Sequence, residues 1–422
     1  MRRLEVPPLL RRNRSFRNFW IAQSISFLGD GVSLLAIPLL AVLKLDASAT
    51  EVAVLSAATM APSLFFSVHF GAWADRIPNR RALMIAADLG RAALLVSLPV
   101  ASVLGLLSLP QLFVVAILSG TLAVLADVSY YTVFVSMVDR EEYIKGSAML
   151  NGSRAVAFVG GNGIAGILVQ LFTAPFALLA DAASFLASAI ALHRAPATEA
   201  PVEEAQSHGV SEGVRFILHT PLIRASLAAT ATFNFFNAAF WALLVVFAVR
   251  TLGVDAGALG LALAVGSLGS VLGTMLTGPI SRRFGLGNAL VLSFVLAPAP
   301  LLLVPAAGGS PGLTLVMLGI AEFLSGIGIM VLDVGLGAVI AALVPDRLRA
   351  RVTGAYNFVN WGIRPLGALG GGLLAAATDL RTTMWVATIG ALAGVLWLLP
   401  SPLPHLRSLP DPVEPAPRTR GT

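Results

Sequence analysis

The stretch from residue 71 to residue 81 reads GAWADRIPNRR and lies at the junction of two long apolar runs. Its glycine lets two helices approach closely, and its acid can dock on a helix N-terminus or on a basic partner. Its arginines can hold the turn at a membrane surface. This spacing predicts a tight turn between two membrane-spanning helices; an ordinary basic loop is the alternative. The residues that carry the pattern are Gly71, Asp75, Arg76, Arg80 and Arg81.

The composition excludes most soluble classes of protein. Of the 422 residues, 57% are hydrophobic and 12% are charged, whereas soluble domains average about 25% charged residues. The high hydrophobicity excludes intrinsic disorder, and the absence of cysteine excludes a disulfide scaffold. The net charge of +6 does not indicate nucleic-acid binding, because apolar runs separate the basic residues. The composition is typical of a polytopic membrane protein embedded in a lipid bilayer.

The apolar runs are long enough to be membrane-spanning helices. A bilayer core of about 30 Å needs about 20 apolar residues per helix. The runs are continuous and do not alternate polar with apolar residues, which argues against a β-barrel. The first run is too long for a cleavable signal peptide. We predict twelve spans, at residues 18–44, 50–73, 80–106, 110–137, 146–171, 174–193, 223–250, 257–281, 286–306, 312–343, 351–377 and 381–400.

The basic residues are distributed unevenly between the loops. If the N-terminus is cytoplasmic, 22 of the 28 lysines and arginines fall in cytoplasmic segments, 3 in outer loops and 3 inside spans. Loops rich in lysine and arginine stay on the cytoplasmic side of a membrane. The distribution therefore predicts a multi-pass protein of the cell membrane with both termini in the cytoplasm.

The longest polar stretch between spans divides the chain into two halves. We predict an N-terminal six-helix bundle at 1–193, a cytoplasmic linker at 194–222 and a C-terminal six-helix bundle at 223–400. The end of the linker, residues 211–219, is expected to form a short surface helix. The tail at 401–422 is rich in proline and is predicted to be disordered and cytoplasmic.

The two halves match each other weakly at an offset of 206–207 residues. Asp30 aligns with Asn237, and Asp127 aligns with Asp333. Chance matching among apolar residues is the alternative, but the rare polar matches share one register. A duplicated chain of this kind places its halves around an axis normal to the membrane. The substrate is then expected near the midplane, between the halves.

The turn at 71–81 resembles motif A of the major facilitator superfamily, from which it departs at Trp73, Pro78 and Asn79. This resemblance implies a gating turn whose residues are Gly71, Asp75, Arg76, Arg80 and Arg81. Over nearly its whole length the chain is similar to the drug:proton antiporter branch, which contains macrolide-efflux and siderophore-export proteins. The blocks that carry this resemblance are FRNFW at 16–20, SFLGD at 26–30, DLGRA at 88–92 and DAASF at 181–185. The resemblance implies an all-α fold of twelve transmembrane helices with 6+6 pseudo-symmetry. It also implies a monomer that needs no cofactor.

Ionisable residues inside the predicted spans are a further signal for function. A charge at the bilayer centre costs about 2.5–3.5 kcal/mol, so each needs a partner or a watery cavity. A carboxylate in a partly dry cavity can exchange protons near neutral pH. Asp30 is the first candidate for this proton coupling, followed by Glu322 and Asp127. The other intramembrane charges are Asp88, Arg91, Arg154, Asp181, Asp333 and Arg364.

Three of these residues have a structural alternative. Asp88 and Arg91 are three residues apart, which is the spacing of an ion pair within one helix. Asp181 can serve as a structural hydrogen-bond acceptor. Both alternatives stay open at the level of sequence.

Span seven carries the side chains that we expect around a large, partly polar ligand. Aromatic and amide groups together can line an apolar pocket with a few polar contacts. Contact with lipid or with other helices is the alternative for each aromatic residue. The candidate cavity residues are Asn234, Phe236, Asn237 and Trp241.

The sequence shows no pattern typical of soluble enzymes. The five histidines have no metal-ligand spacing, and no G-x-x-x-x-G-K-[ST] motif indicates ATP use. We therefore predict a secondary active transporter, not an enzyme and without a metal site. It would export an amphipathic small molecule, such as a drug or a macrolide, in exchange for protons. Siderophore export and metabolite symport are alternatives, and a membrane-embedded binding or scaffold protein that does not transport is the alternative from another class.

Overall fold

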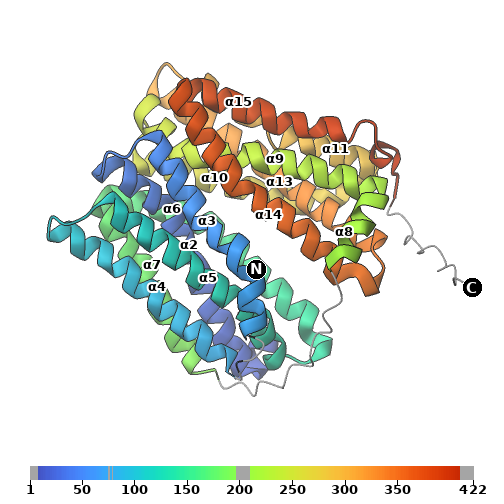
Figure 1. Cartoon of the computed structure of the whole chain (residues 1–422), viewed down its shortest axis with the longest axis horizontal. Helices are drawn as coiled ribbons and strands as arrows, with labels where there is room; N and C mark the ends of the chain where they lie inside the picture. The colour runs from blue at the N-terminus through green and yellow to red at the C-terminus, as the bar shows by residue number, and fades with distance from the viewer. Residues whose placement is uncertain (1–7, 75–76, 78, 196–209, 409–422) are drawn as a thin grey trace, which may run out of the picture.

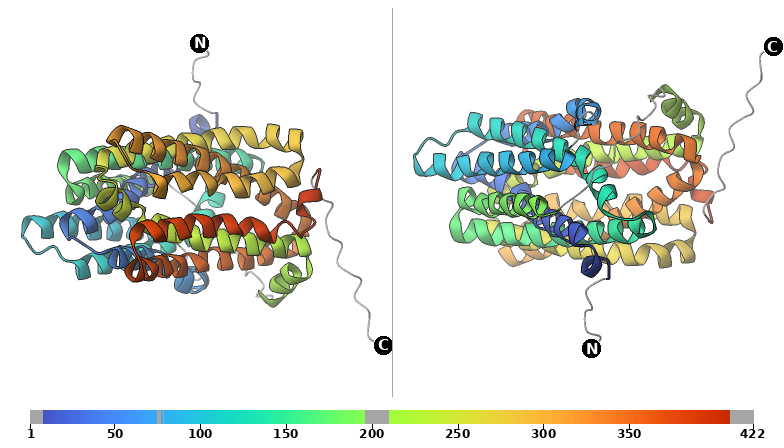
Figure 2. Two further views of the ribbon diagram at one scale, coloured as in Figure 1. Left: turned by 90° about the horizontal axis from the view of Figure 1, so that it is seen from above. Right: turned by 90° about the horizontal axis from the view of Figure 1, so that it is seen from below.

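The computed structural model describes residues 8–74, 77, 79–195 and 210–408, and within these ranges the chain is helical without strands (Figure 1). The long helices run roughly side by side, as both views in Figure 2 show. The first group comprises α1 (Pro8–Arg12), α2 (Arg14–Lys44), α3 (Ala49–Ala74), α4 (Arg80–Val103), α5 (Leu109–Met137), α6 (Tyr143–Phe172) and α7 (Ala174–His193). The second comprises α8 (Val210–His219), α9 (Pro221–Val246), α10 (Ala256–Phe284), α11 (Leu286–Leu296), α12 (Leu303–Ala306), α13 (Pro311–Leu343), α14 (Asp346–Ala377) and α15 (Leu380–Ala393).

Short polar side chains begin several of these helices. The side chain of Asn13 accepts a hydrogen bond of 2.8 Å from the backbone N–H of Phe16 and thereby satisfies a free donor of the first turn of α2. Hydrogen bonds from the hydroxyl and the backbone N–H of Thr382 lower the pKa of Asp379, the cap of α15. The remaining side-chain caps of this kind are Asn79 on α4, Asp255 on α10 and Ser310 on α13.

The apolar runs of the sequence coincide with these helices, which confirms a polytopic helical membrane protein. Ten segments in the described ranges are long and apolar enough to cross a membrane, and α6 and α14 are not among them. The interiors of these two helices hold Arg154 and Asn162 in α6, and Asn360 and Arg364 in α14. Asn162 and Asn360 are buried, and Arg154 and Arg364 line a cavity. Polar side chains are tolerated there because they avoid lipid. A total of twelve spans stays a prediction.

The helices form two groups that repeat the same packing. Figure 1 shows α2 to α7 in blue to green at the lower left, and α9 to α15 in yellow-green to red at the upper right. In α6, a Cβ atom added to Gly161 would lie 3.1 Å from the carbonyl oxygen of Leu28 in α2. Gly367 of α14 packs in the same way against the carbonyl oxygen of Phe235 in α9. Gly161 and Gly367 are separated by the offset of the sequence repeat, and so are Leu28 and Phe235. The two groups of helices therefore make the same packing contact at matching positions.

The two groups meet at one end of the molecule. Arg250, in the π-helical turn Phe247–Thr251 after α9, forms an ion pair of 2.6 Å with Asp46, which follows α2. The hydroxyl of Thr50 in α3 donates to the carbonyl oxygen of Gly372 in α14 at 3.1 Å. We call this region the closed end. The ribbons diverge toward the opposite end, where α8 lies (Figure 1).

The structure describes the end of the segment between the groups and the start of the tail. The short helix expected at 211–219 is observed as α8, whose Glu212 forms an ion pair with Arg351 of α14. The expectation of a disordered tail from 401 needs correction for residues 401–408. The backbone N–H of Gly287 in α11 donates to the carbonyl oxygen of Leu406 at 2.8 Å. Leu403 is buried in the same apolar cluster as Leu286 and Leu290 of α11. Residues 196–209 and 409–422 lie outside the described ranges.

Candidate functional site

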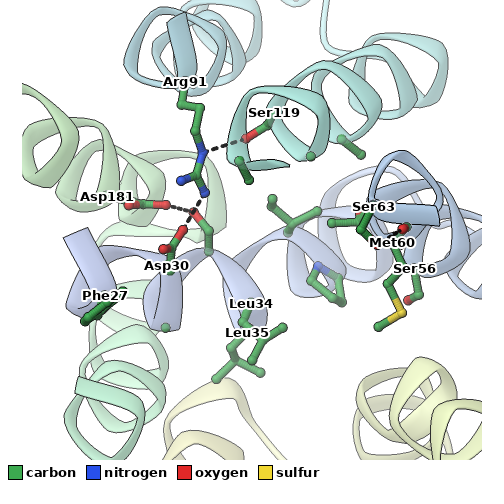
Figure 3. A pocket seen from close by; sticks show the side chains of 18 of the residues that line it. Phe27, Asp30, Leu34, Leu35, Ser56, Met60, Ser63, Arg91, Ser119 and Asp181 are labelled. Atoms are coloured by element: carbon green, nitrogen blue, oxygen red, sulfur yellow. Dashed lines mark hydrogen bonds and ion pairs between the residues drawn. The ribbon is translucent and has the colours of Figure 1, made fainter. Parts of the chain in front are cut away.

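A cavity of about 680 Å³ lies between the two groups of helices. Its wall is built by α2 to α7 on one side and by α9, α10 and α14 on the other. Apolar side chains such as Leu34, Leu35 and Met60 share this wall with charged and hydroxyl groups (Figure 3). A concave wall that is mostly apolar with a few polar groups suits a partly apolar small molecule.

Arg91 of α4 is held on three sides at the edge of this cavity. Its guanidinium forms an ion pair with Asp30 of α2, and its Nε donates to the hydroxyl of Ser119 at 3.4 Å (Figure 3). The ring of Phe185 in α7 lies 4.0 Å from the guanidinium carbon. The Asp30 side chain is 41% exposed, whereas that of Arg91 is 12% exposed. Asp30 is therefore accessible from the cavity, and Arg91 is fixed behind it.

Two further carboxylates lie close to this ion pair and accept hydrogen bonds from hydroxyl groups. Asp181 of α7 is fully buried and accepts from Ser33 and, at 3.0 Å, from Ser184. Asp88 of α4 is also buried and accepts from Ser188 at 2.7 Å. The ion pair within α4 that its spacing allowed is not observed, because Arg91 pairs with Asp30 across helices.

Asp127 and Arg154 form a second charged pair on the same wall. Asp127 of α5 and Arg154 of α6 both line the cavity and interact electrostatically. The guanidinium carbon of Arg154 lies 4.6 Å from the centre of the Phe27 ring. The first group of helices thus contributes most of the charge around the cavity.

The opposite wall carries an amide network with a single guanidinium. Arg364 of α14 donates from Nε to the amide oxygen of Asn234 in α9 at 3.0 Å. Asn234 in turn donates to the amide oxygen of Asn360 at 2.9 Å. The ring of Trp361 lies 4.1 Å from the guanidinium carbon of Arg364. The network ties α9 to α14, and it keeps this wall polar with little charge.

One face of α9 presents the remaining candidate residues to the cavity. Asn234, Asn237 and Trp241 all line it, and their spacing of three and four positions is that of one helix face. The side-chain oxygen of Asn237 is buried and has no hydrogen-bond partner among the described residues. This oxygen is available to a ligand.

Two candidates from the sequence do not line the cavity. Phe236 packs against Gly390 of α15 instead, because its position on α9 points away from the face of Asn237. Glu322 of α13 is buried against Gly266 of α10 and does not line the cavity. One of its carboxyl oxygens has no partner among the described residues. The placement of Glu322 does not favour direct exchange of protons with the cavity.

The gating turn is described only in part. Asp75 and Arg76 lie outside the described residues, and for Gly71 only its place in α3 is described. Arg80 is buried at the start of α4 and donates to the hydroxyl of Thr132 in α5. Arg81 donates to the backbone carbonyl of Ala195, after α7. These two arginines anchor the turn within the first group of helices, and the gating role stays a prediction.

Several side chains that contact the charged residues were not predicted from the sequence. Ser119 and Phe185 hold Arg91, Ser33 supports Asp181, and Asn360 completes the amide network. Asn360 had a usable signal, because it lies one helical turn before Arg364 on the same face. The serines had none, because serine is common in membrane helices as a packing residue.

The fold and the cavity together define a transporter of the major facilitator class. Two pseudo-symmetric groups of membrane helices enclose a central cavity that closes at one end. A family model described as transmembrane secretion effector, MFS_3, matches residues 6–418, so the chain belongs to this family of membrane transporters for small molecules.

The chain is also similar to two named relatives and to solved structures. It is 26% identical over 409 residues to the multidrug efflux pump Tap of Mycolicibacterium fortuitum, covering 90% of this chain and 93% of that protein. It is 26% identical over 387 residues to the uncharacterized MFS-type transporter YfiS of Bacillus subtilis (strain 168), covering 87% of this chain and 88% of the relative.

Two solved structures are similar to this chain in fold but have low sequence identity to it. One is a bacterial homologue of the iron transporter ferroportin in an inward-facing state, with a TM-score of 0.73, 16% identity, and coverage of 92% of this chain and 98% of that chain. The other is the nucleoside transporter NupG, with a TM-score of 0.69, 14% identity and the same coverage. These matches confirm the predicted helical, pseudo-symmetric major facilitator fold.

Proposed function

We propose that the protein exports an amphipathic small molecule from the cytoplasm and that inward movement of protons drives this export. The observation that carries the proposal is the accessible carboxylate of Asp30, paired with Arg91 in the wall of a mostly apolar cavity. A proton and a substrate can compete for such a carboxylate, which is the physical basis of exchange. The similarity to a multidrug efflux pump supports a drug or a natural product as the substrate.

A direct test uses purified protein in two steps. Thermal-shift measurements against macrolides and siderophores identify a ligand, because a ligand at 100 times its Kd stabilises the folded state by about 2.7 kcal/mol. Proteoliposomes with an imposed pH gradient then show whether that ligand accumulates. Binding without any response to the gradient would instead favour a membrane-embedded binding protein.

Labelling of single cysteines tests the proposed orientation in the cell membrane. The natural chain has no cysteine, so each introduced thiol gives a clean signal. Leu218 of α8 is 54% exposed, and the space around Gly308 at the other end of the molecule is open. We expect Leu218→Cys to resist an impermeant thiol reagent in intact cells, and Gly308→Cys to react. The reverse result would place the termini outside the cell.

The apolar part of the cavity is tested by Trp241→Ala. Loss of this buried aromatic surface is expected to weaken binding of the identified ligand by about 1–2 kcal/mol, or about 5- to 30-fold in Kd. Trp397→Ala is the matched control, because Trp397 is 54% exposed and lies outside the cavity. Equal losses of affinity in the two variants would exclude Trp241 from the ligand site.

A further inference from the structure

Three carboxylates surround Arg91, and one of them holds it in an ion pair. Asp30, Asp88 and Asp181 come from α2, α4 and α7, and each interacts electrostatically with the guanidinium. Arg91 directs its described hydrogen bonds to Asp30 and Ser119. A buried carboxylate without a compensating cation is unfavourable, and such a group takes up a proton instead. The cluster is therefore built to hold a proton on one of the other two carboxylates.

The surroundings of Asp181 favour the protonated form of its side chain. Its described hydrogen-bond partners are the neutral hydroxyls of Ser33 and Ser184, and the side chain is fully buried. Among the described residues no ion pair reaches this carboxylate, because Arg91 is paired with Asp30. The α6 helix also packs on α7, but its intramembrane charge is Arg154, which interacts with Asp127 instead.

Asp88 lies in a different electrostatic environment although it is equally buried. Its strongest interaction with a charged group is the attraction to Arg91, three positions further along the same helix. The hydroxyl of Ser188 adds a hydrogen bond of 2.7 Å. A nearby opposite charge favours the ionised carboxylate. Gly29, the neighbour of Asp30, packs against Asp181, so Asp181 is the buried acid that α2 contacts directly beside Asp30.

We propose that Asp181 stores the proton that is exchanged for substrate, and that Asp30 passes this proton between the cavity and Asp181. This inference rests on the proton coupling proposed above. The side chains of Asp30 and Asp181 lie next to each other beside Arg91 (Figure 3). Gly29, the neighbour of Asp30, packs directly against Asp181 and Ser184, so no side chain separates α2 from the buried acid.

The proposed transfer keeps charge and protons balanced. Water in the cavity gives a proton to Asp30, which is the exposed member of the cluster. Asp30 then passes the proton to Asp181, and Asp30 returns to a carboxylate that Arg91 stabilises. The stored proton also leaves through Asp30, so the departing proton and the substrate compete for this carboxylate. Release of the proton reverses these steps.

Infrared spectroscopy of the reconstituted protein tests the assignment without any substrate. A protonated carboxylic acid has its own carbonyl-stretch band, which disappears as the group ionises with rising pH. We expect the wild-type protein to show a titrating band that Asp181→Asn lacks and that Asp88→Asn, the matched control, retains. A band that persists in Asp181→Asn and disappears in Asp88→Asn would assign the proton to Asp88 and overturn the proposal.

A second variant keeps the test valid if Asp181→Asn does not fold. Ser33→Ala removes a hydroxyl that donates to the carboxylate of Asp181. A hydrogen bond to the ionised form favours ionisation, so its loss should raise the pH at the midpoint of the titration, by about one pH unit. An unchanged midpoint in Ser33→Ala would show that the titrating group is not Asp181.

Transport measurements separate this proposal from the proposed function. If wild-type proteoliposomes do not respond to a pH gradient, proton coupling itself fails, whatever the infrared spectra show. If the wild type accumulates ligand and Asp181→Asn still does so with the same pH profile, coupling stands and the storage role of Asp181 fails. Both proposals are supported if the pH profile of transport flattens in Asp181→Asn and the titrating band is lost.

Discussion

Asp30→Asn is expected to abolish ligand transport driven by a pH gradient, while ligand binding remains measurable. The amide has the shape of the carboxylate but does not titrate, and it leaves Arg91 without its ion-pair partner. In the proposed relay this substitution blocks the path to the buried Asp181. It also frees Arg91 to interact with that carboxylate, which disfavours proton storage there. The measurement is ligand accumulation in proteoliposomes with and without an imposed pH gradient.

Glu322→Gln is the matched comparison for this prediction. Glu322 is another carboxylate within a spanning helix, but it packs between α10 and α13 and does not line the cavity. We expect Glu322→Gln to retain transport that responds to the gradient. If Asp30→Asn transports normally and Glu322→Gln does not, the coupling acid is Glu322 and protons reach the second group of helices. A loss in both variants, with normal binding, would indicate two coupling acids.

The sequence predicted the helices because length and apolarity determine them almost directly. Every predicted span coincides with a helix or a broken helix, and caps such as Asn79 could be identified from residue type and position. The repeat was also detectable, since the matching polar residues of the two halves are separated by one offset. Asp30 was predicted as a functional candidate from its depth in the first span and from its neutral counterpart in the repeat, Asn237.

The pairing of the charges could not be predicted in the same way. Spacing along one helix suggested that Arg91 pairs with Asp88, but the partner observed is Asp30 on another helix. Which of two acids an arginine contacts depends on the rotation of packed helices, and local spacing contains no information on this rotation. For the same reason the three-carboxylate cluster around Arg91 became visible only in the structure.

The direction in which the aromatic side chains of α9 point was equally hard to predict. In a soluble helix the polar face marks the solvent side, but lipid is as apolar as a protein core. The α9 helix therefore shows no pattern that distinguishes Trp241, in the cavity wall, from Phe236, which packs on α15. The amides Asn234 and Asn237 mark the cavity face better, because an unpaired amide is costly in lipid.

Gly260→Val is expected to disrupt the closed end and to reduce transport strongly. A Cβ atom on Gly260 of α10 would lie 2.7 Å from the Cα atom of Gly166 and 2.8 Å from the carbonyl oxygen of Asn162, both in α6. Both are backbone atoms, so no side chain can move aside to make room. Since α6 and α10 belong to different groups of helices, the clash is relieved when these groups separate.

The size of this effect follows from the cost of overpacking, which is about 1–3 kcal/mol. A penalty of this size acts on the closed conformation alone and shifts the equilibrium between two conformations by about 5- to 150-fold. Transport needs both conformations in turn, so turnover should fall by a similar factor while ligand still binds. Spin labels on α6 and α10 would report the separation as a longer distance at the closed end.

Gly319→Val provides the control that separates this clash from a general effect of valine in a helix. Gly319 lies inside α13, and an added Cβ atom there would meet nothing within 4 Å. Both substitutions change the helix propensity by the same small amount. If Gly319→Val lowers transport as much as Gly260→Val, the loss comes from the helices themselves. A normal Gly319→Val beside an impaired Gly260→Val would show that transport requires close contact between α6 and α10, because each cycle must re-form the closed end.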